Sequence, residues 1–142
     1  MAQQSPLPEK LIAADPDYFY ESCLLGWGGA NLDSFDSEKL TQYRKSWNNA
    51  DTIRAMCDDY RAAIQFDWAL DTEDRNRCLQ IPACVMWGKT GAMARHFDVP
   101  ATWNKNFSNI EKKLMDGGHF FPDQHPQETV SALVSFIINN IN

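Results

Sequence analysis

Three histidines are the side chains of this sequence that can exchange a proton near neutral pH: His96, His119 and His125. His119 has the most informative context, because it follows Asp116-Gly117-Gly118 between a predicted strand and the last predicted helix. Ligands of an open α/β sheet bind beyond the carboxyl ends of its strands, where a histidine can act as a general base. A loop histidine that only packs is the alternative, but the two glycines favour catalysis. His96 and His125 are interpreted as surface or helix-cap residues.

Two aromatic residues could donate hydrogen bonds in a pocket. Tyr60 carries a hydroxyl, and the indole N–H of Trp27 can only donate, which suits an anion such as a halide. An aromatic residue on a helical face is more often part of a core. Spacing alone therefore favours a structural role for both residues.

The sequence carries no recognisable nucleophile or metal motif. There is no G-x-S-x-G elbow and no glycine-rich phosphate loop. The carboxylates at 58–59 and 71–74 read as solvated charges. The four cysteines form no C-x-x-C pair and have no zinc-like spacing to histidine, so we expect reduced, buried thiols. We expect neither a metal nor an organic cofactor.

The first 77 residues are predicted to be helical. Asp15 can cap a helix that begins at Pro16 and runs to about Trp27, where Gly28-Gly29 ends it. Asp36 or Ser37 starts a second helix. A longer helix is predicted from about 52 to 69, with one apolar face repeating at helical spacing. The charged stretch 71–77 is predicted to be a connector and a domain boundary.

From about residue 78 the pattern becomes β-α-β-α. The apolar run 81–88 predicts a strand buried on both faces, followed by a helix over 100–107 and a strand over 110–115. A last helix begins near Pro126, with an apolar stripe at Val130, Leu133, Val134, Ile137 and Ile141. Two strands and two helices cannot cover a parallel sheet. We therefore predict an α/β fold that is the end of a larger doubly wound sheet.

Composition limits the partners and the compartment. The formal net charge is −6 and the sequence pI is about 4.9, so nucleic acid is not an expected partner. No apolar run is long enough for a membrane span, and the first residues do not read as a signal peptide. We expect a cytoplasmic protein.

Several segments together resemble the haloacetate (fluoroacetate) dehalogenases. The most specific is Met56-Cys57-Asp58-Asp59-Tyr60-Arg61-Ala62, and the terminal Gly117-Gly118-His119-Phe120 is shared by many α/β-hydrolases. The other matching segments are Ser5 to Ile12, Asp15 to Phe19, Leu25-Gly26-Trp27, Phe35-Asp36, Tyr43-Arg44, Phe66-Asp67 and Ile81-Pro82 through Trp87-Gly88. The resemblance covers nearly the whole chain.

This resemblance implies a helical cap over residues 1–77 and the C-terminal part of an α/β-hydrolase core over 78–142. In the family an aspartate displaces halide from a haloacetate, giving an ester that a histidine-activated water hydrolyses. His119 matches that histidine, and Trp27 and Tyr60 match donors to the departing halide. The implied ligands are a small haloacid and a halide ion.

The chain departs from the family by what it does not contain. In the family the nucleophilic aspartate, the carboxylate-binding arginines and the orienting aspartate all precede the cap. The position after Trp87-Gly88, where many α/β-hydrolases keep the orienting acid, reads Lys89-Thr90-Gly91. We therefore predict no dehalogenation by this chain alone. It is expected to need the N-terminal half or self-association, and a homodimer of the family type is compatible.

Two other functions stay open at this stage. An epoxide hydrolase uses the same fold and the same Asp–His chemistry, with cap tyrosines that protonate the epoxide oxygen; Tyr60 could be one of them. A non-catalytic protein that oligomerises through an uncovered sheet edge is the third hypothesis.

Overall fold

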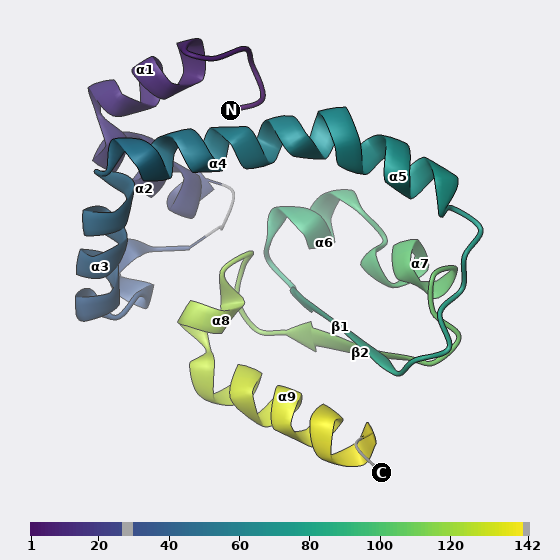
Figure 1. Cartoon of the computed structure of the whole chain (residues 1–142). Coiled ribbons are helices and arrows are strands. Elements are labelled where there is room, and N and C mark those ends of the chain that lie inside the picture. Colours follow the sequence, from purple (N-terminus) through teal and green to yellow (C-terminus); the bar gives the residue numbers. More distant parts are fainter. Residues whose placement is uncertain (27–29, 141–142) are drawn as a thin grey trace. The chain divides into compact units, whose positions relative to one another are not determined.

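The chain forms two compact units in the computed structural model, which describes residues 1–26 and 30–140. One unit consists of Met1–Cys23 and Asp36–Arg75, and the other of Leu24–Phe35 and Asn76–Asn142. Each unit has its own secondary structure, helical in the first and β-α-β-α in the second (Figure 1). The predicted cap over residues 1–77 stays a prediction.

Side-chain caps mark the starts of two helices of the first unit. Asp15 Oδ1 accepts the N–H of Tyr18 at 3.0 Å, and Asp36 Oδ1 accepts two amides at the start of the next helix, each at 3.0 Å. Both predicted helix starts are confirmed. The helices are α1 (Leu7–Ala14), α2 (Pro16–Gly26), α3 (Ser37–Trp47), α4 (Ala50–Ala62) and α5 (Trp68–Glu73). The predicted stop at Gly28-Gly29 lies outside the described residues.

The helix predicted over 52–69 is longer than expected. Asn49 caps it, and α4 continues through a π-helical stretch, η2 (Ala63–Asp67), into α5. The charged residues 71–73 are therefore helical, and their prediction as a connector is wrong. Charged residues are compatible with the solvent-exposed face of a helix, so charge alone does not end it. The connector begins at Asp74.

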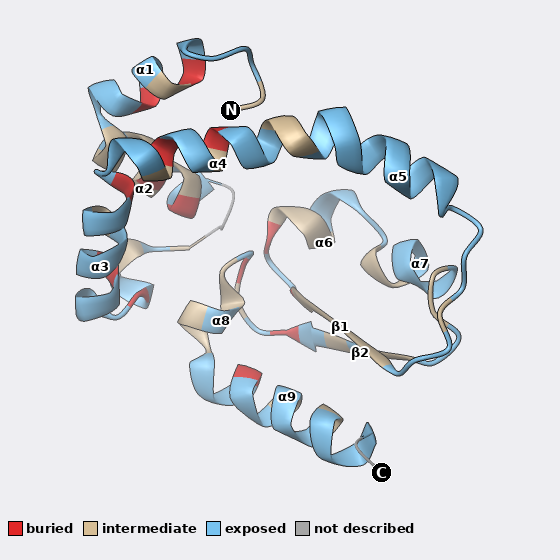
Figure 2. Ribbon diagram, in the orientation of Figure 1, coloured by how far each residue is buried: buried red, intermediate tan, exposed pale blue. Residues whose placement is uncertain are grey.

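The core of the first unit forms where α4 meets its neighbours. Ile53 is 3% exposed and Cys57 is fully buried, and the Tyr20 and Trp47 rings stack at 5.3 Å between centroids. Figure 2 shows the buried positions of α4 in its first half, with η2 and α5 exposed. The predicted apolar face packs only over this half, because Tyr60 and Ile64 are exposed.

The second unit is a two-stranded parallel sheet with helices on both faces. Strand β1 (Ala83–Gly88) pairs with β2 (Ile110–Met115), with Ala83 opposite Ile110 and Gly88 opposite Met115. Helices α6 (Ala92–His96) and α7 (Val99–Asn104) lie on one side of the sheet and α9 (Pro126–Asn140) on the other (Figure 1). Short elements that the sequence did not predict are α1, α6, α8 (Phe121–Gln124) and a 3₁₀ turn, η1 (Leu32–Ser34).

The apolar stripe of α9 is present but uncovered. Val130, Leu133, Val134 and Ile137 are each 42% to 56% exposed, and Ile141 lies outside the described residues. Lys113 of β2 nevertheless ties this helix to the sheet, its Nζ donating to the Ala132 carbonyl at 3.3 Å. Across residues 1–26 and 30–140, no helix combines the length and apolar character that a bilayer crossing requires.

Truncation of Ile53 should destabilise the helical unit. The substitution Ile53→Ala removes a side chain that is 3% exposed and leaves a cavity, which costs about 2–5 kcal/mol of unfolding free energy. Ile64→Ala on the same continuous helix is the matched control, because its side chain is 66% exposed. Urea unfolding followed by helical circular dichroism measures both. Equal losses in the two variants would contradict the described core.

The first unit should also lose stability in acid through Asp17. Its carboxylate accepts the Trp47 indole N–H at 2.5 Å and the Asn48 amide at 2.7 Å, and these bonds hold the pKa of Asp17 below its ordinary value. A lowered folded pKa means that the stabilisation is full above the unfolded pKa, near 4, and is lost as the pH falls through the folded pKa. Asp17→Asn should therefore flatten the fall of unfolding free energy between about pH 4 and pH 2. An unchanged acid limb would refute this.

Candidate functional site

The loop that carries His119 begins at the carboxyl end of β2. Met115, the last residue of the strand, is buried, and the chain then turns through Asp116-Gly117-Gly118. Gly117 has φ +98°, a left-handed conformation that side chains disfavour. The glycine pair thus allows a sharp turn that delivers His119 immediately beyond the strand end.

The end of β1 holds this loop through backbone and ionic contacts. Lys89 N–H donates to the Met115 carbonyl at 2.9 Å, and Thr90 N–H donates to the Gly117 carbonyl at 3.0 Å. The Lys89 ammonium also pairs with the Asp116 carboxylate, and this bond lowers the pKa of Asp116. The residues after Trp87-Gly88 therefore anchor the histidine loop.

Glycine at the end of β1 permits this close approach. A Cβ at Gly88 would lie 1.8 Å from the Gly118 carbonyl oxygen, and a Cβ at Gly91 would lie 2.7 Å from the His119 nitrogen. In both places the obstruction is backbone, which cannot rotate away. Both glycines are needed for space at the histidine loop.

Gln124 of α8 fixes the loop from the other side. Its Oε1 accepts the N–H of Gly118 at 2.7 Å, and Gly118 is buried. This bond satisfies an amide immediately before His119 that has little access to water. Sequence reasoning singled out the neighbouring His125 and missed Gln124; a lone glutamine six residues from its partner gives no pattern signal.

His119 itself is exposed on one side and lines a small cavity on the other. The cavity has a volume of about 120 Å³ and is lined by Met86, Trp87, Gly88, Gly91, Met93, His119 and Phe121. The imidazole meets the Phe120 ring edge to face, at 5.1 Å between centroids. The side chains that line this cavity, all within the described part, include no carboxylate. An imidazole here can take a proton from water, but any nucleophile must come from elsewhere.

Tyr60 lies on α4 in the first unit and is 48% exposed. Its neighbour Tyr20 is buried, and its hydroxyl has no hydrogen-bond partner among the described residues. Burial raises the pKa of Tyr20 to about 12, with smaller contributions from Cys57, Cys23 and Tyr60. Trp27 lies outside the described residues. Of the three predicted site residues, Tyr60 therefore lies in the first unit and His119 in the second. That the three line a common pocket stays a prediction.

His96 lies at the surface and His125 at a helix boundary, in agreement with their interpretation as surface or helix-cap residues. His96 is exposed at the end of α6, beside a hollow of about 430 Å³ that Arg95 and Phe97 also line. His125 joins α8 to α9, and its carbonyl accepts both the N–H and the hydroxyl of Thr129, at 3.1 and 2.9 Å. It therefore acts as a helix cap.

The four cysteines are free thiols, and the expectation that they are buried is only partly confirmed. Cys57 is buried and burial raises its pKa, whereas Cys78 is exposed. Cys78 lies in the segment between α5 and β1. Within residues 1–26 and 30–140, no three His, Cys, Asp or Glu side chains group as a metal site would need.

The chain is similar to a curated relative and to several solved structures. It is 42% identical over 137 residues to a fluoroacetate dehalogenase of Burkholderia sp, covering 96% of this chain and 45% of the relative. A candidate α/β-hydrolase of Nostoc sp PCC 7120 is 34% identical with a TM-score of 0.89, covering 96% of this chain and 46% of its own. A candidate epoxide hydrolase of Pseudomonas aeruginosa is 30% identical with a TM-score of 0.85, covering 98% and 47%. No family model matches the chain.

These similarities confirm two predictions. The chain has part of an α/β-hydrolase fold. Its sequence is also similar to that of a fluoroacetate dehalogenase, as the resemblance predicted. The chain spans less than half the length of each of these three relatives. The part of the α/β-hydrolase fold that this chain contains therefore has a sheet of two strands.

Removal of the Gln124 side chain should loosen the histidine loop. Gln124→Ala leaves the Gly118 amide without its acceptor at a cost of about 1 kcal/mol or more, so this amide should exchange with deuterium several-fold faster. Gln124→Glu keeps an acceptor oxygen and should retain protection. Gln127→Ala, an exposed glutamine on α9, is the matched control. Unchanged Gly118 exchange in Gln124→Ala would show that the bond does not hold the loop.

Proposed function

We propose, from the premise that this chain has the C-terminal half of an α/β-hydrolase fold and is related to fluoroacetate dehalogenase, that it supplies the cap and the general base of a haloacetate dehalogenase. One observation carries the proposal: 42% identity over 137 residues to the Burkholderia sp fluoroacetate dehalogenase. The place of His119 beyond the carboxyl end of β2 supports it.

The proposed reaction has two steps. A carboxylate outside this chain attacks the α-carbon of the haloacetate; the new carbon–oxygen bond forms as the carbon–halogen bond breaks, and halide leaves with the electron pair. His119 then takes a proton from water as the water oxygen adds to the ester carbonyl. Cleavage of the ester releases the hydroxyacid and regenerates the carboxylate. The imidazolium returns its proton to solvent.

The cap contributes at the first step. The Tyr60 hydroxyl and the Trp27 indole N–H are proposed to donate to the halide as its negative charge develops. Fixed donors of this kind stabilise a transition state more than the neutral substrate. Tyr60 is 48% exposed, so its side chain is accessible to such a ligand. No cofactor takes part in this scheme.

The chain is proposed to be inactive alone, because it contains no recognisable nucleophile. It is also proposed to act in the cytoplasm. The free thiols of its cysteines are compatible with a reducing compartment. The partner half carries the nucleophile, the orienting acid and the carboxylate-binding groups, whether it belongs to the same polypeptide or to another chain.

An epoxide hydrolase is the second candidate. The Pseudomonas aeruginosa structure, 30% identical with a TM-score of 0.85, favours it. In that reaction Tyr60 would protonate the epoxide oxygen as the carboxylate opens the ring. Comparing fluoroacetate with a simple epoxide on the completed protein separates the two, because one releases fluoride and the other a diol. The third hypothesis, a non-catalytic oligomer, predicts turnover of neither.

The test completes the enzyme and follows fluoride. The N-terminal half of the Burkholderia sp relative is co-expressed with this chain, and fluoride release from fluoroacetate is measured with an ion-selective electrode. His119→Ala should release at most one fluoride per enzyme and leave a carboxymethyl ester on the nucleophile, visible by mass spectrometry, because water is no longer activated. Sustained turnover by His119→Ala would refute its role, and a folded, associated complex that releases no fluoride would refute the function.

Tyr60 has its own test in the same complex. Tyr60→Phe removes one donor to the leaving halide and should slow fluoride release by roughly 10²-fold. Tyr18→Phe is the matched control, because Tyr18 is an exposed tyrosine of the first unit with no proposed role. A smaller effect with bromoacetate, whose leaving group needs less stabilisation, would support halide binding. Equal rates for both variants would contradict it.

A further inference from the structure

A basic hollow of about 430 Å³ adjoins the cavity that His119 lines. The residues that line this hollow are Gly26, Ala92, Met93, Arg95, His96 and Phe97. All six belong to the second unit, so the hollow is formed within that unit. Met93 also lines the cavity of His119, so the hollow and the cavity are neighbours across one side chain.

Helix α6 joins the hollow to the histidine loop. Gly91, which precedes the helix, is packed so closely that a Cβ there would lie 2.7 Å from the His119 nitrogen. Arg95 N–H donates to the Gly91 carbonyl at 3.3 Å, and Phe97 N–H donates to the Met93 carbonyl at 3.0 Å. One helical turn of 3.6 residues therefore leads from the backbone of His119 to Arg95.

The polar groups of the hollow have hydrogen-bonding capacity to spare. The Arg95 and His96 side chains are exposed in the last turn of α6, and neither has a hydrogen bond or ion pair to the other described residues. Arg44 and Arg61 of the first unit, in contrast, each pair with a glutamate at 2.6 Å. The carboxylate that follows along the chain, Asp98, accepts the first free amide of α7 at 2.9 Å. The guanidinium of Arg95 is thus open to an external acceptor.

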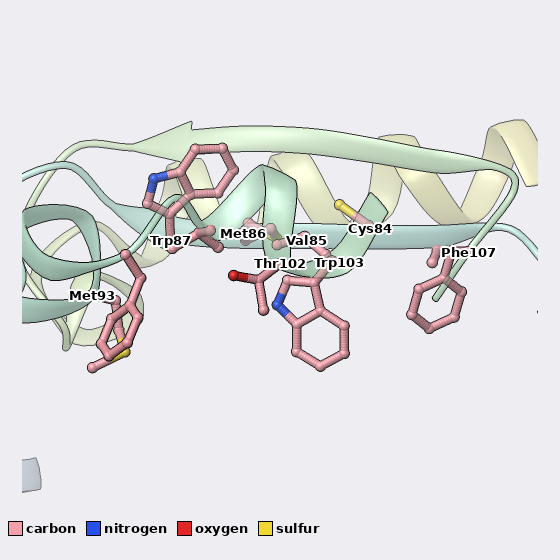
Figure 3. A pocket seen from close by; sticks show the side chains of 11 residues that line it. Cys84, Val85, Met86, Trp87, Met93, Thr102, Trp103 and Phe107 are labelled. Atoms are coloured by element: carbon pink, nitrogen blue, oxygen red, sulfur yellow. The ribbon is translucent and has the colours of Figure 1, made fainter. Parts of the chain in front are cut away.

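The lining of the hollow matches a small monocarboxylate. A guanidinium presents parallel N–H donors at the spacing of the two carboxylate oxygens, and its single charge balances one negative charge. Ala92, Met93 and Phe97 provide apolar wall for a short carbon chain. Met93 also borders an apolar groove of about 590 Å³, but that groove is lined by no charged side chain, so a carboxylate has no cationic partner there (Figure 3).

We propose that this hollow binds the carboxylate of a small haloacid as the substrate approaches the His119 cavity. Arg95 is the ionic partner and His96 a second hydrogen-bond donor. The chain has a formal net charge of −6, which repels an anion, and a local cation offsets this repulsion at the point of entry. The inference rests on the proposed function for the choice of a haloacid. It is distinct from the carboxylate-binding groups of the other half, which hold the substrate during the reaction.

Binding is measured on the full chain alone, without reference to activity. Fluoroacetate is titrated and followed by fluorine NMR, and fluoroacetamide, which has a similar size and no charge, is the ligand control. Fluoroacetate should bind saturably and shift the Arg95 side-chain N–H resonance, whereas fluoroacetamide should do neither. Arg95→Gln should weaken binding roughly tenfold, because it removes a charge-assisted pair of hydrogen bonds. Absence of saturable binding, or equal binding of the two ligands, would overturn the proposal.

Matched variants separate the hollow from the general charge of the protein. Lys105→Gln removes the same charge from an exposed position of the same unit outside the hollow, and should leave affinity unchanged. Arg95→Lys keeps the charge but loses the planar donor pair, so its affinity should be intermediate. Circular dichroism verifies that the three variants fold. Equal affinities of Arg95→Gln and Lys105→Gln would exclude the hollow, and chloride competing as strongly as acetate would exclude a carboxylate site.

Kinetics of the completed enzyme test the role of the hollow in substrate approach. In the complex with the N-terminal half of the Burkholderia sp relative, Arg95→Gln should raise the KM for fluoroacetate several-fold and leave kcat nearly unchanged. The difference in KM should shrink toward 1 M salt, where screening acts over about 3 Å. A purely structural role of Arg95 would instead lower kcat at every salt concentration, and that result would contradict the proposal.

The two proposals fail in different ways. If fluoroacetate binds the chain through Arg95 but the completed, folded complex releases no fluoride, the hollow stands and the proposed function fails. If the complex releases fluoride and Arg95→Gln changes neither binding nor KM, the proposed function stands and the hollow fails.

Discussion

The parallel pairing of β1 with β2 is the interaction on which the second unit depends. It brings the two strand ends together, so that the segment after Gly88 can hold the loop after Met115. His119 then owes its position to contacts that start in β1, about thirty residues earlier in the chain. Parallel strands gain their neighbours only through a crossover, which here is the α6–α7 segment. A fault in that pairing would displace the imidazole even if its own loop were intact.

Sequence patterns predicted the elements whose causes are local. Asp15 and Asp36 were identifiable as caps because a short acceptor before a helix start has a direct physical effect. The run that became β1 was identifiable because an uncharged strand between proline and glycine has few other readings. The charged stretch after Leu70 was misjudged, since charge is compatible with both a connector and a solvated helix. The place of His119 after β2 was predicted by order along the chain alone.

Features that depend on contacts between distant segments could not be predicted. The Lys89–Asp116 pair and the bond from Gly118 to Gln124 join residues whose types are common on any surface. The exposure of Tyr60 and of the α9 stripe could not be predicted either, because a periodic apolar pattern does not indicate how much of that face the chain itself covers. The uncovered apolar surface and the two-stranded sheet have the same origin. Both are features of a chain that spans less than half the length of its hydrolase relatives.

The π-helical stretch η2 lies between α4 and α5 within one continuous helix. A π turn accommodates about one extra residue, and one residue of an α-helix corresponds to a rotation of about 100°. The side chains of α5, including Trp68 and Leu70, are therefore turned relative to the row that Ile53 and Cys57 define in α4. Loss of a single residue within 63–67 would convert the segment to regular α-helix and swing the aromatic end around its axis, while the packed half stayed in place. Evolution could thus re-aim that end of the helix by changing chain length by one, with no substitution in the core.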